Sequence, residues 1–330
     1  MVSNEIGIED TKILKGLAII AIVFTHANAP HFDLLGKLSF INWNILCAIG
    51  LSMFLFLSGY GVFKSYKRSG LNSYWENKIR RVMLPYVVCH VAWLALSVFQ
   101  NGSIEFEYVD LLTSFIGIRT TSVLCSSMWY ISFTWFLYFI FFVSFTLLPE
   151  NMAVYSMLIW VGGLLIVTPN VWPDGGACSI LFPIGVLWAN YENKIKVSMF
   201  EKKYIFIVLM VTILGAFMCI KINYFSFVGH FIKNVIRVLL VICCIYYVKN
   251  IIFIDKMKRV LIFFGDCSYY LYLIHLKGIE FVTYVCNINA IEGNRRLILF
   301  IALLCILLVV SFFLMRIQSK ICQLTNRANQ

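Results

Sequence analysis

The chain contains 330 residues, of which 61% are hydrophobic and only 13% are charged, and its mean hydropathy is +0.85. This composition excludes a water-soluble globular domain of the same length and predicts a protein embedded in a lipid bilayer. The net charge of +11 would suit nucleic acid, but basic residues in membrane proteins more often mark the cytoplasmic side. We therefore expect membrane lipid as a partner and no nucleic acid.

Apolar stretches bounded by charged residues, Pro or Gly follow one another along the whole chain. A spanning helix needs about 20 mostly apolar residues, and the short alternating segments of a β-barrel are absent from the sequence. The predicted spans are 13–29, 44–63, 82–99, 128–148, 153–168, 177–191, 204–221, 233–254, 260–284 and 297–316. The expected fold class is all-α, a polytopic transmembrane helix bundle of about ten spans that forms a single domain over residues 1–330. The longest segment between spans, 100–127, is expected to include an interfacial helix around Val109 to Ile118.

The first predicted span also resembles a secretory signal peptide, with an apolar core at Leu17–Phe24 and a cleavage-like Ala27–Ala29. The residues before this apolar core include three acidic residues and two lysines, whereas a signal peptide begins with a basic segment. We expect this segment to be retained as a membrane span.

The segment between the second and third predicted spans, 64–81, indicates the orientation in the membrane. Its basic residues outnumber a single acid, Glu76, and they are Lys64, Lys67, Arg68, Lys78, Arg80 and Arg81. Such an excess is typical of a cytoplasmic loop. Alternation then places the basic segments 192–203 and 249–259 inside as well, and it predicts that both termini are cytoplasmic.

Lys15 and His26 lie on one face of the first span, because eleven residues at about 100° each make three turns plus roughly 20°. Lys15 is expected near the inner boundary, and His26 roughly 16 Å further along the helix, in the outer half of the membrane. An ionisable side chain at that depth is costly unless it serves a function, although it also forms helix-packing hydrogen bonds in some bundles. A neutral imidazole is the usual general base for activating a hydroxyl group near neutral pH.

A second deep imidazole, His275, shares a helix face with Tyr272 and Ser268. Counted from the inner ends of their spans, His26 and His275 both lie roughly 21 to 23 Å from the cytoplasmic surface, so they are placed to meet across the bundle. The alternative is that Tyr272 and His275 satisfy each other inside a packed core.

Lys78, Arg80 and Arg81 form a basic cluster at the start of the third span. Guanidinium groups bind phosphate oxygens through two parallel hydrogen bonds, so this cluster suits a donor that carries several phosphates. The same residues also serve as topology determinants and suit anionic lipid headgroups. Nearby, Ser58 and Gly59 end the second span next to Gly61, and this small-residue segment would admit a donor's phosphate or pantetheine arm, or would serve helix packing.

Trp129 is the aromatic residue that we expect to stack on a sugar acceptor, although interfacial belts account for most Trp residues at such positions. The sequence contains no metal-ligand cluster, no Ser-His-Asp order and no phosphate-binding Walker loop. We expect no metal and no bound cofactor.

Four blocks of the sequence together resemble the acyltransferase 3 family of integral membrane O-acyltransferases. Lys15–His26 resembles the opening basic-x10-His motif of that family. Ser58–Phe63 with Lys78–Tyr86 resembles the second block, Ser127–Ile131 the Trp-Phe-Leu block, and Gly265–His275 the late Ser-Tyr-x-x-Tyr-Leu-x-His block.

The resemblance implies ten spans in a bacterial inner membrane, acetyl-CoA as the cytoplasmic donor substrate, and a glycan or lipid-linked sugar acceptor reached from the outer side. Our hypothesis is that His26 acts at the reaction centre, either as a general base or through an acyl-histidine intermediate. Lys15 would stabilise donor charge at the inner mouth, and Tyr272 with His275 would orient His26 or stabilise the oxyanion. Lys78 stands where the family has the first arginine of an Arg-x-x-Arg pair, which replaces a planar fork by a point charge. A carrier or flippase for a glycan or lipid-linked sugar is the alternative function, because deep ionisable residues also line transport paths.

Overall fold

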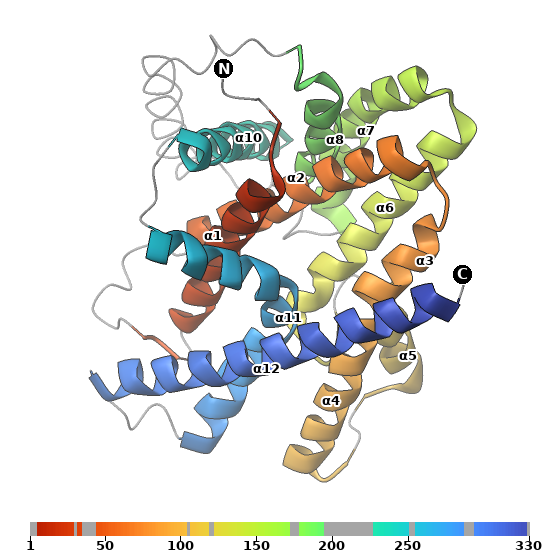
Figure 1. The fold of residues 1–330 in the computed structure, drawn as a ribbon. Helices are drawn as coiled ribbons and strands as arrows, with labels where there is room; N and C mark the ends of the chain where they lie inside the picture. Colours follow the sequence, from red (N-terminus) through yellow and green to blue (C-terminus); the bar gives the residue numbers. More distant parts are fainter. Residues whose placement is uncertain are drawn as a thin grey trace. The chain divides into compact units, whose positions relative to one another are not determined.

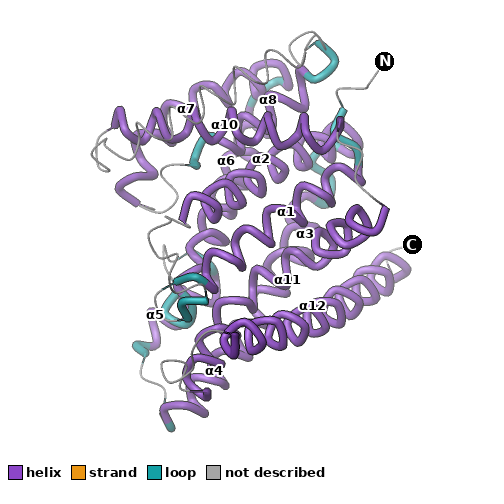
Figure 2. The backbone as a smooth tube through the Cα atoms, turned by 90° about the vertical axis from the view of Figure 1, so that its left-hand side faces the viewer, coloured by secondary structure: helices purple, strands orange, loops and turns teal. Residues whose placement is uncertain are grey.

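The computed structural model describes residues 5–29, 32–34, 44–103, 106–118, 122–171, 178–194, 227–250, 255–286 and 294–328. The regular secondary structure in these residues is helical, and no strand occurs among them (Figures 1 and 2). The expected all-α fold class is therefore confirmed.

The helices are α1 (Ile8–Ala27), α2 (Asn44–Ser69), α3 (Tyr74–Lys78), α4 (Leu84–Asn101), α5 (Tyr108–Ile116), α6 (Trp129–Leu147), α7 (Glu150–Val171), α8 (Leu181–Tyr191), α10 (Phe227–Asn250), α11 (Asp255–Cys286) and α12 (Asn294–Ala328). Two short helices of other types join them: the π-helix η2 (Ile79–Met83) between α3 and α4, and the 3-10 helix η3 (Ser126–Met128) before α6.

Six helical segments of the described residues are long and apolar enough to cross a membrane. They are Asn44–Ser69, Tyr74–Asn101, Ser126–Leu147, Glu150–Val171, Val228–Lys249 and Arg295–Ile321, and each contains one of the predicted spans or most of it. The predicted span 177–191 corresponds to α8, which is apolar but shorter. The predicted span 204–221 lies outside the described residues. The total of ten spans and the cytoplasmic termini stay predictions.

The predicted spans 13–29 and 260–284 fall on α1 and α11, which are helices of 20 and 32 residues. Neither is among the six apolar spans. The physical reason is that both carry polar and ionisable side chains within the apolar stretch, including Lys15 and His26 on α1 and Asp266 and His275 on α11. The two helices that carry the candidate histidines are therefore less apolar than the six segments above.

The described chain forms two compact units. Unit 1 comprises Met1–Ala18, Ala48–Asn72 and Phe133–Gly265, and unit 2 comprises Ile19–Cys47, Ser73–Ser132 and Asp266–Gln330. Helices α1, α2, α6 and α11 each contribute residues to both units.

Two helix pairs of unit 1 approach each other at reciprocal glycines. A Cβ atom on Gly59 of α2 would lie 2.1 Å from a carbonyl oxygen of the segment that carries α8, and one on Gly185 of α8 would lie 2.1 Å from a carbonyl oxygen of α2. Helices α1 and α11 approach in the same way through Gly16 and Gly265, with distances of 2.1 and 2.0 Å. Such contact between backbones requires residues without a side chain, so these glycines set the spacing of both pairs.

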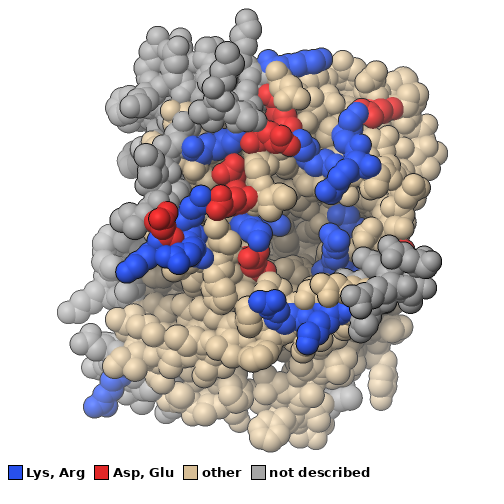
Figure 3. All heavy atoms as spheres, in the orientation of Figure 1, with Lys and Arg blue, Asp and Glu red and all other residues tan. Residues whose placement is uncertain are grey.

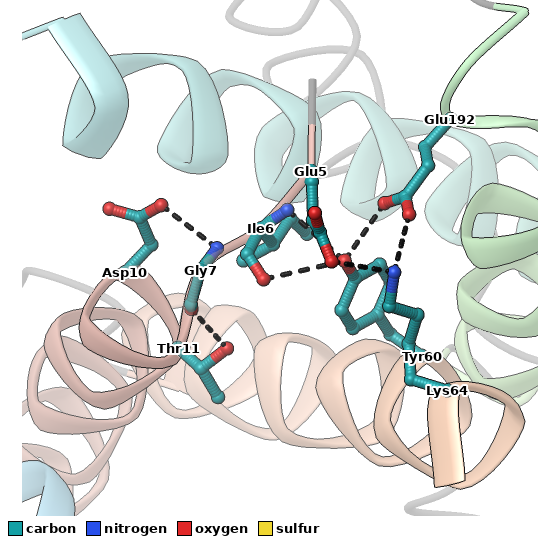
Figure 4. A network of polar contacts seen from close by, with 8 residues as sticks. All are labelled: Glu5, Ile6, Gly7, Asp10, Thr11, Tyr60, Lys64 and Glu192. Atoms are coloured by element: carbon teal, nitrogen blue, oxygen red, sulfur yellow. Dashed lines mark hydrogen bonds and ion pairs between the residues drawn. The ribbon is translucent and has the colours of Figure 1, made fainter. Parts of the chain in front are cut away.

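A buried carboxylate fastens the N-terminal segment of unit 1 (Figure 4). Glu192, whose side chain is 3% exposed, accepts hydrogen bonds from the Tyr60 hydroxyl and the Lys64 ammonium group, each at 2.8 Å. Lys64 also pairs with Glu5 at 2.7 Å, and the backbone N–H of Ile6 donates to the Tyr60 hydroxyl at 3.1 Å. The hydrogen bond and charge of Lys64 lower the pKa of Glu5 below its ordinary value. Charged groups that are paired in this way escape most of the cost of burial.

Other charges of unit 1 are also matched in pairs, such as Lys67 with Glu150 and Lys258 with Glu9. On the face drawn in Figure 3, acidic side chains lie beside basic ones, and broad areas between them carry neither.

In unit 2, α4 and α5 are joined by the Tyr86 hydroxyl, which donates to the Ser114 carbonyl oxygen at 2.6 Å. The helix expected around Val109 to Ile118 is confirmed as α5, and Tyr108, Val109 and Leu112 are exposed on it. Exposed apolar side chains on a short helix suit a position at the membrane interface, which stays a prediction.

Candidate active site

The two deep imidazoles meet in unit 2, as their predicted depths imply. His26 comes from the C-terminal end of α1 and His275 from the middle of α11. The Nε2 atom of His275 lies 3.0 Å from the Nδ1 atom of His26, and the ring centroids are 4.9 Å apart at an interplanar angle of 48°. The expected contact is confirmed, whereas a catalytic role for either residue stays a prediction.

The hydrogen bonds of the pair fix where each proton lies when both rings are neutral. His275 Nδ1 faces two main-chain carbonyl oxygens, of Tyr272 at 2.7 Å and Leu271 at 3.1 Å. Carbonyl oxygens only accept, so this nitrogen carries the proton and Nε2 of His275 carries a lone pair. His26 Nδ1 must then be the donor to His275, and it also faces the Ile22 carbonyl oxygen at 3.1 Å. The lone pair of His26 is therefore left on Nε2, where a general base requires it.

The two rings differ in burial. His275 is fully buried at 0% exposure, whereas His26 is only partly buried. His26 is consequently the more exposed member of the pair.

Tyr272 does not use its hydroxyl group to satisfy His275. That hydroxyl donates to the main-chain carbonyl oxygen of Ser127, and the Tyr272 ring lies 5.3 Å from that of Tyr130. The alternative in which the Tyr272 and His275 side chains bond to each other is therefore wrong, because the imidazole bonds to the backbone of Tyr272 instead. Tyr272 joins α11 to the start of α6.

Two residues of the predicted donor-binding cluster, Arg80 and Arg81, lie in the π-helix η2, and Lys78 is the last residue of α3. Pro85 lacks an N–H group, so it cannot donate to the carbonyl oxygens four and five residues earlier, which belong to Arg81 and Arg80. The side-chain amide of Gln318 on α12 fills this gap, donating from Nε2 to Arg80 at 3.0 Å and to Arg81 at 3.3 Å. The Tyr270 hydroxyl in turn donates to Gln318 Oε1 at 2.6 Å.

The neighbouring carbonyl oxygen in this π-helix, that of Val82, accepts the Tyr269 hydroxyl at 2.7 Å. Side chains of α11 and α12 therefore bind the backbone of η2, which carries Arg80 and Arg81. These side chains are distant in sequence and reach η2 only in the folded chain. A backbone held in this way keeps its side chains in a fixed direction.

The cations of the segment have different surroundings. Arg81 is exposed, whereas Arg80 pairs with Glu76 one turn earlier at 2.5 Å. Lys78 lies over the ring of Tyr74, with its Nζ atom 5.5 Å from the ring centroid. The α-helical spacing that would put Lys78 and Arg81 on one face does not apply across a π-helical turn.

Comparison with known proteins identifies the family. A family model described as an acyltransferase domain matches residues 9–316. The chain belongs to the acyltransferase 3 family. None of the curated proteins and none of the solved structures compared with it gives a match.

Membership of the acyltransferase 3 family makes the chain a membrane acyltransferase. The sites predicted from its sequence divide between the two units. Unit 2 contains His26, Lys78, Arg80, Arg81, Trp129, Tyr272 and His275, and unit 1 contains Lys15, Ser58 and Gly59.

The three predicted donor contacts of unit 1 lie on α1 and α2. Lys15 is partly buried on α1, eleven residues before His26. Ser58 shares a hydrogen bond of 2.8 Å with the Tyr138 hydroxyl, and Gly59 makes the close approach to α8 described above. Gly61 has no neighbouring atom within 4 Å of its ideal Cβ position. Ser58 and Gly59 thus take part in helix packing, and their contact with the donor stays a prediction.

Trp129, the predicted acceptor contact of this acyltransferase, is buried at 8% exposure. Its ring lies edge to face with Tyr130, 6.0 Å between centroids. Stacking on a sugar stays a prediction that would require this ring to become accessible.

Two further residues of unit 2 were not singled out from the sequence. Gln318 is one amide near the end of the last helix, and no local pattern ties it to a turn more than 230 residues earlier. His90 is a third buried imidazole, bonded to the Tyr86 carbonyl oxygen at 3.1 Å and to the Ser122 hydroxyl at 3.0 Å. The depth argument applied to His26 would have singled it out, but its two ring nitrogens are both occupied within the protein.

Proposed function

We propose that this chain is an O-acyltransferase of the bacterial inner membrane, which moves an acyl group, in the first instance acetyl, from cytoplasmic acyl-CoA to a hydroxyl group of a cell-surface glycan or lipid-linked sugar. The observation that carries the proposal is the pair formed by His26 and His275. It leaves a basic nitrogen on His26, the more exposed residue of the pair, in a chain of an acyltransferase family.

The reaction proceeds by general-base catalysis. The acceptor hydroxyl gives its proton to Nε2 of His26 while its oxygen attacks the thioester carbonyl carbon of acyl-CoA. The carbon–sulfur bond then breaks, and the CoA sulfur takes the proton back from Nε2 of His26. The products are the acyl ester and free CoA thiol, and His26 returns to its starting state.

His275 stabilises the charged state of its partner. When His26 is protonated, its Nδ1–H group donates to His275 Nε2 from a positive ring, and such a bond is stronger than the neutral one. His275 is itself kept in the required tautomer by the carbonyl oxygens of Leu271 and Tyr272. In this account His275 is a positioning residue and does not touch the substrate.

The donor's phosphates bind the cations of the π-helical segment, with Arg81 the most exposed of them. Lys15, Ser58 and Gly59, which belong to unit 1, stay predicted contacts of the donor. Trp129 contacts the acceptor, and Tyr272 acts with His275 to orient His26. These roles follow the family motif residue by residue and are part of the proposal.

The decisive experiment uses the purified full chain in lipid vesicles with radiolabelled acetyl-CoA and a glycan acceptor. Label should appear on the glycan with the wild-type protein and fall to background with His26→Gln. His90→Gln is the matched control, since it removes another buried imidazole of unit 2 and should transfer label normally once folded. Movement of unmodified glycan across the vesicle without label transfer would contradict the proposal and favour a carrier.

A second measurement separates the two chemical routes. With labelled acetyl-CoA and no acceptor, a direct transfer leaves the protein unlabelled after acid quench. Label retained on the wild-type chain and absent from His26→Gln would instead show an acyl-histidine intermediate.

A further inference from the structure

Helix α11 carries an ion pair that has no part in the proposed reaction. Lys277 and Glu280 lie at i and i+3, and the Lys277 Nζ atom is 2.8 Å from Glu280 Oε2. Both residues belong to unit 2, as do His26 and His275. They follow His275 along the helix axis, Lys277 by roughly 3 Å and Glu280 by roughly 7.5 Å. The predicted topology places that direction toward the outer side, from which the acceptor arrives.

Stability does not account for this pair. Both charges fall within the predicted span 260–284, and the side chains of Lys277 and Glu280 are only 22% and 42% exposed. Ionisable side chains inside a membrane span are rare and point by default to a function. An ion pair within one helix contributes only about 0.3–0.5 kcal/mol to stability. Because it lies within α11, the pair also joins no distant parts of the chain.

Arg296, another cation of unit 2 on the predicted outer side, has a structural role by contrast. Its guanidinium group donates to the carbonyl oxygens of Asp33 at 3.1 Å and Phe32 at 3.4 Å, and it lies 3.6 Å from the Asp33 carboxylate. It thereby fastens the segment after α1 to the start of α12. The charges of Lys277 and Glu280 need a different explanation.

Electrostatic interactions place the pair near the reaction centre. The Glu280 carboxylate is close enough to His26 for its charge to act on the imidazole. The charges of Glu280 and Lys277 both act on Cys125, the residue before η3. Because α6 begins with Trp129 directly after η3, the pair lies near both the basic imidazole and the segment that leads to the predicted acceptor contact.

The direction of Glu280 on the helix agrees with this placement. Glu280 is about 80° around the helix axis from Tyr272 and about 140° from His275. Tyr272 faces η3, because its hydroxyl donates to the Ser127 carbonyl oxygen. Glu280 is therefore on the flank of α11 that is turned toward η3, further outward than the buried ring of His275.

The chemistry of the pair suits a ligand with several hydroxyl groups. An ionised carboxylate accepts hydrogen bonds through two oxygens, and an ammonium group has three N–H donors. The contact between Lys277 and Glu280 uses only part of this capacity. Neighbouring hydroxyl groups of a sugar both donate and accept, so they match a carboxylate beside an ammonium group. Hydrogen bonds to such charged groups are stronger than neutral ones.

We propose that Glu280 and Lys277 bind hydroxyl groups of the acceptor sugar next to the one that is acylated, and so select which hydroxyl reaches His26. This inference rests on the proposed function, because it assigns residues to the acceptor of that reaction. Glu280 accepts a hydrogen bond from one neighbouring hydroxyl, and Lys277 donates to another. The attacking hydroxyl is positioned through its neighbours, since all of them are fixed on one sugar ring.

The test measures acetyl transfer in vesicles to the unacylated glycan extracted from cells that lack this chain. Glu280→Gln keeps the shape of the side chain and removes its charge. It should raise the KM for the glycan by about tenfold or more, the effect of losing a charge-assisted hydrogen bond. The KM for acetyl-CoA should stay unchanged. Glu107→Gln is the matched control, the same substitution at an exposed carboxylate of unit 2, and should leave both KM values unchanged.

A reversed pair separates ligand binding from helix stability. Lys277→Glu combined with Glu280→Lys keeps opposite charges at the same spacing, so a pair that only stabilises α11 would tolerate it. We expect the reversed chain to keep its Tm and size-exclusion profile but to show the raised KM for the glycan. Product analysis by NMR should find acetyl groups on more hydroxyls than with the wild type. Restoration of the wild-type KM by the reversed pair would overturn the proposal, as would a wild-type KM in Glu280→Gln.

Failure of this inference is distinguishable from failure of the proposed function. If Glu280→Gln transfers label to the same hydroxyl with the wild-type KM, only the roles of Glu280 and Lys277 are lost. Label transfer by His26→Gln at the wild-type rate would instead sink the proposed reaction, whatever the Glu280 variant shows.

Discussion

The replacement His275→Phe tests the histidine pair, because it removes the acceptor of the His26 Nδ1–H bond and keeps a buried aromatic ring. The tautomer of His26 should survive, since the Ile22 carbonyl oxygen at 3.1 Å still accepts from Nδ1. What is lost is the strengthening of the 3.0 Å bond when His26 becomes positive. A neutral hydrogen bond contributes about 1 kcal/mol and a charge-assisted one about 1.5–3 kcal/mol, so the difference is about 0.5–2 kcal/mol. The kcat should therefore fall by more than about twofold and by up to about thirtyfold.

The assay is steady-state acetyl transfer in vesicles, with kcat and KM determined separately for both substrates. His26→Gln removes the base and should lower kcat by about 10²- to 10⁴-fold, so it must be the more damaging of the two changes. His275→Gln should recover part of the activity, because its amide oxygen can accept from His26. The KM values should change little, since His275 does not touch the substrate.

His90→Phe is the control for loss of a buried imidazole, and it should lower the Tm without lowering kcat. The reasoning is refuted if His275→Phe has a kcat within about twofold of the wild-type value while its Tm falls like that of His90→Phe. That result would make the pair a packing contact.

Three further changes test the surroundings of the site. Gln318→Leu leaves two π-helical carbonyl oxygens without their amide donor. It should raise the KM for acyl-CoA by about two- to tenfold with little change in kcat. An unchanged KM would show that this turn does not contribute to donor binding. Gly59→Ala would put a methyl group 2.1 Å from a carbonyl oxygen and should lower the free energy of unfolding by about 1–3 kcal/mol. Gly61→Ala, which has open space for the methyl group, should leave the stability unchanged or raise it. Equal Tm values for the two variants would contradict the close approach of α2 and α8. Glu5 has a pKa lowered by Lys64, so its contribution to stability is present above its unfolded pKa and is lost as the pH falls through the lower folded value. Below about pH 4 the Tm of the wild type should therefore approach that of Glu5→Gln, and a constant Tm difference from pH 7 to pH 3 would count against the ion pair.

The sequence predicted where residues lie along single helices. The depths of His26 and His275 follow from the fixed rise of an α-helix, because backbone hydrogen bonds within one helix set that rise whatever the helix packs against. The family motifs and the apolar composition likewise belong to the chain itself. For the same reason α5 and most of the apolar spans are found where they were expected.

Contacts between helices were decided by the tertiary structure. The proton positions of the histidine pair, the hydrogen bonds of Gln318 to a π-helical turn and the hydrogen bond from the Ile180 N–H group to Asn234 all depend on how distant helices pack. The crossing angles and the register of the helices arise from the packing of many side chains and from close approach at a few glycines. The spacing of residues along one helix does not determine them. From sequence alone, the residues of this acyltransferase could be assigned to helices and depths; which of them share a hydrogen bond was set only when the helices packed.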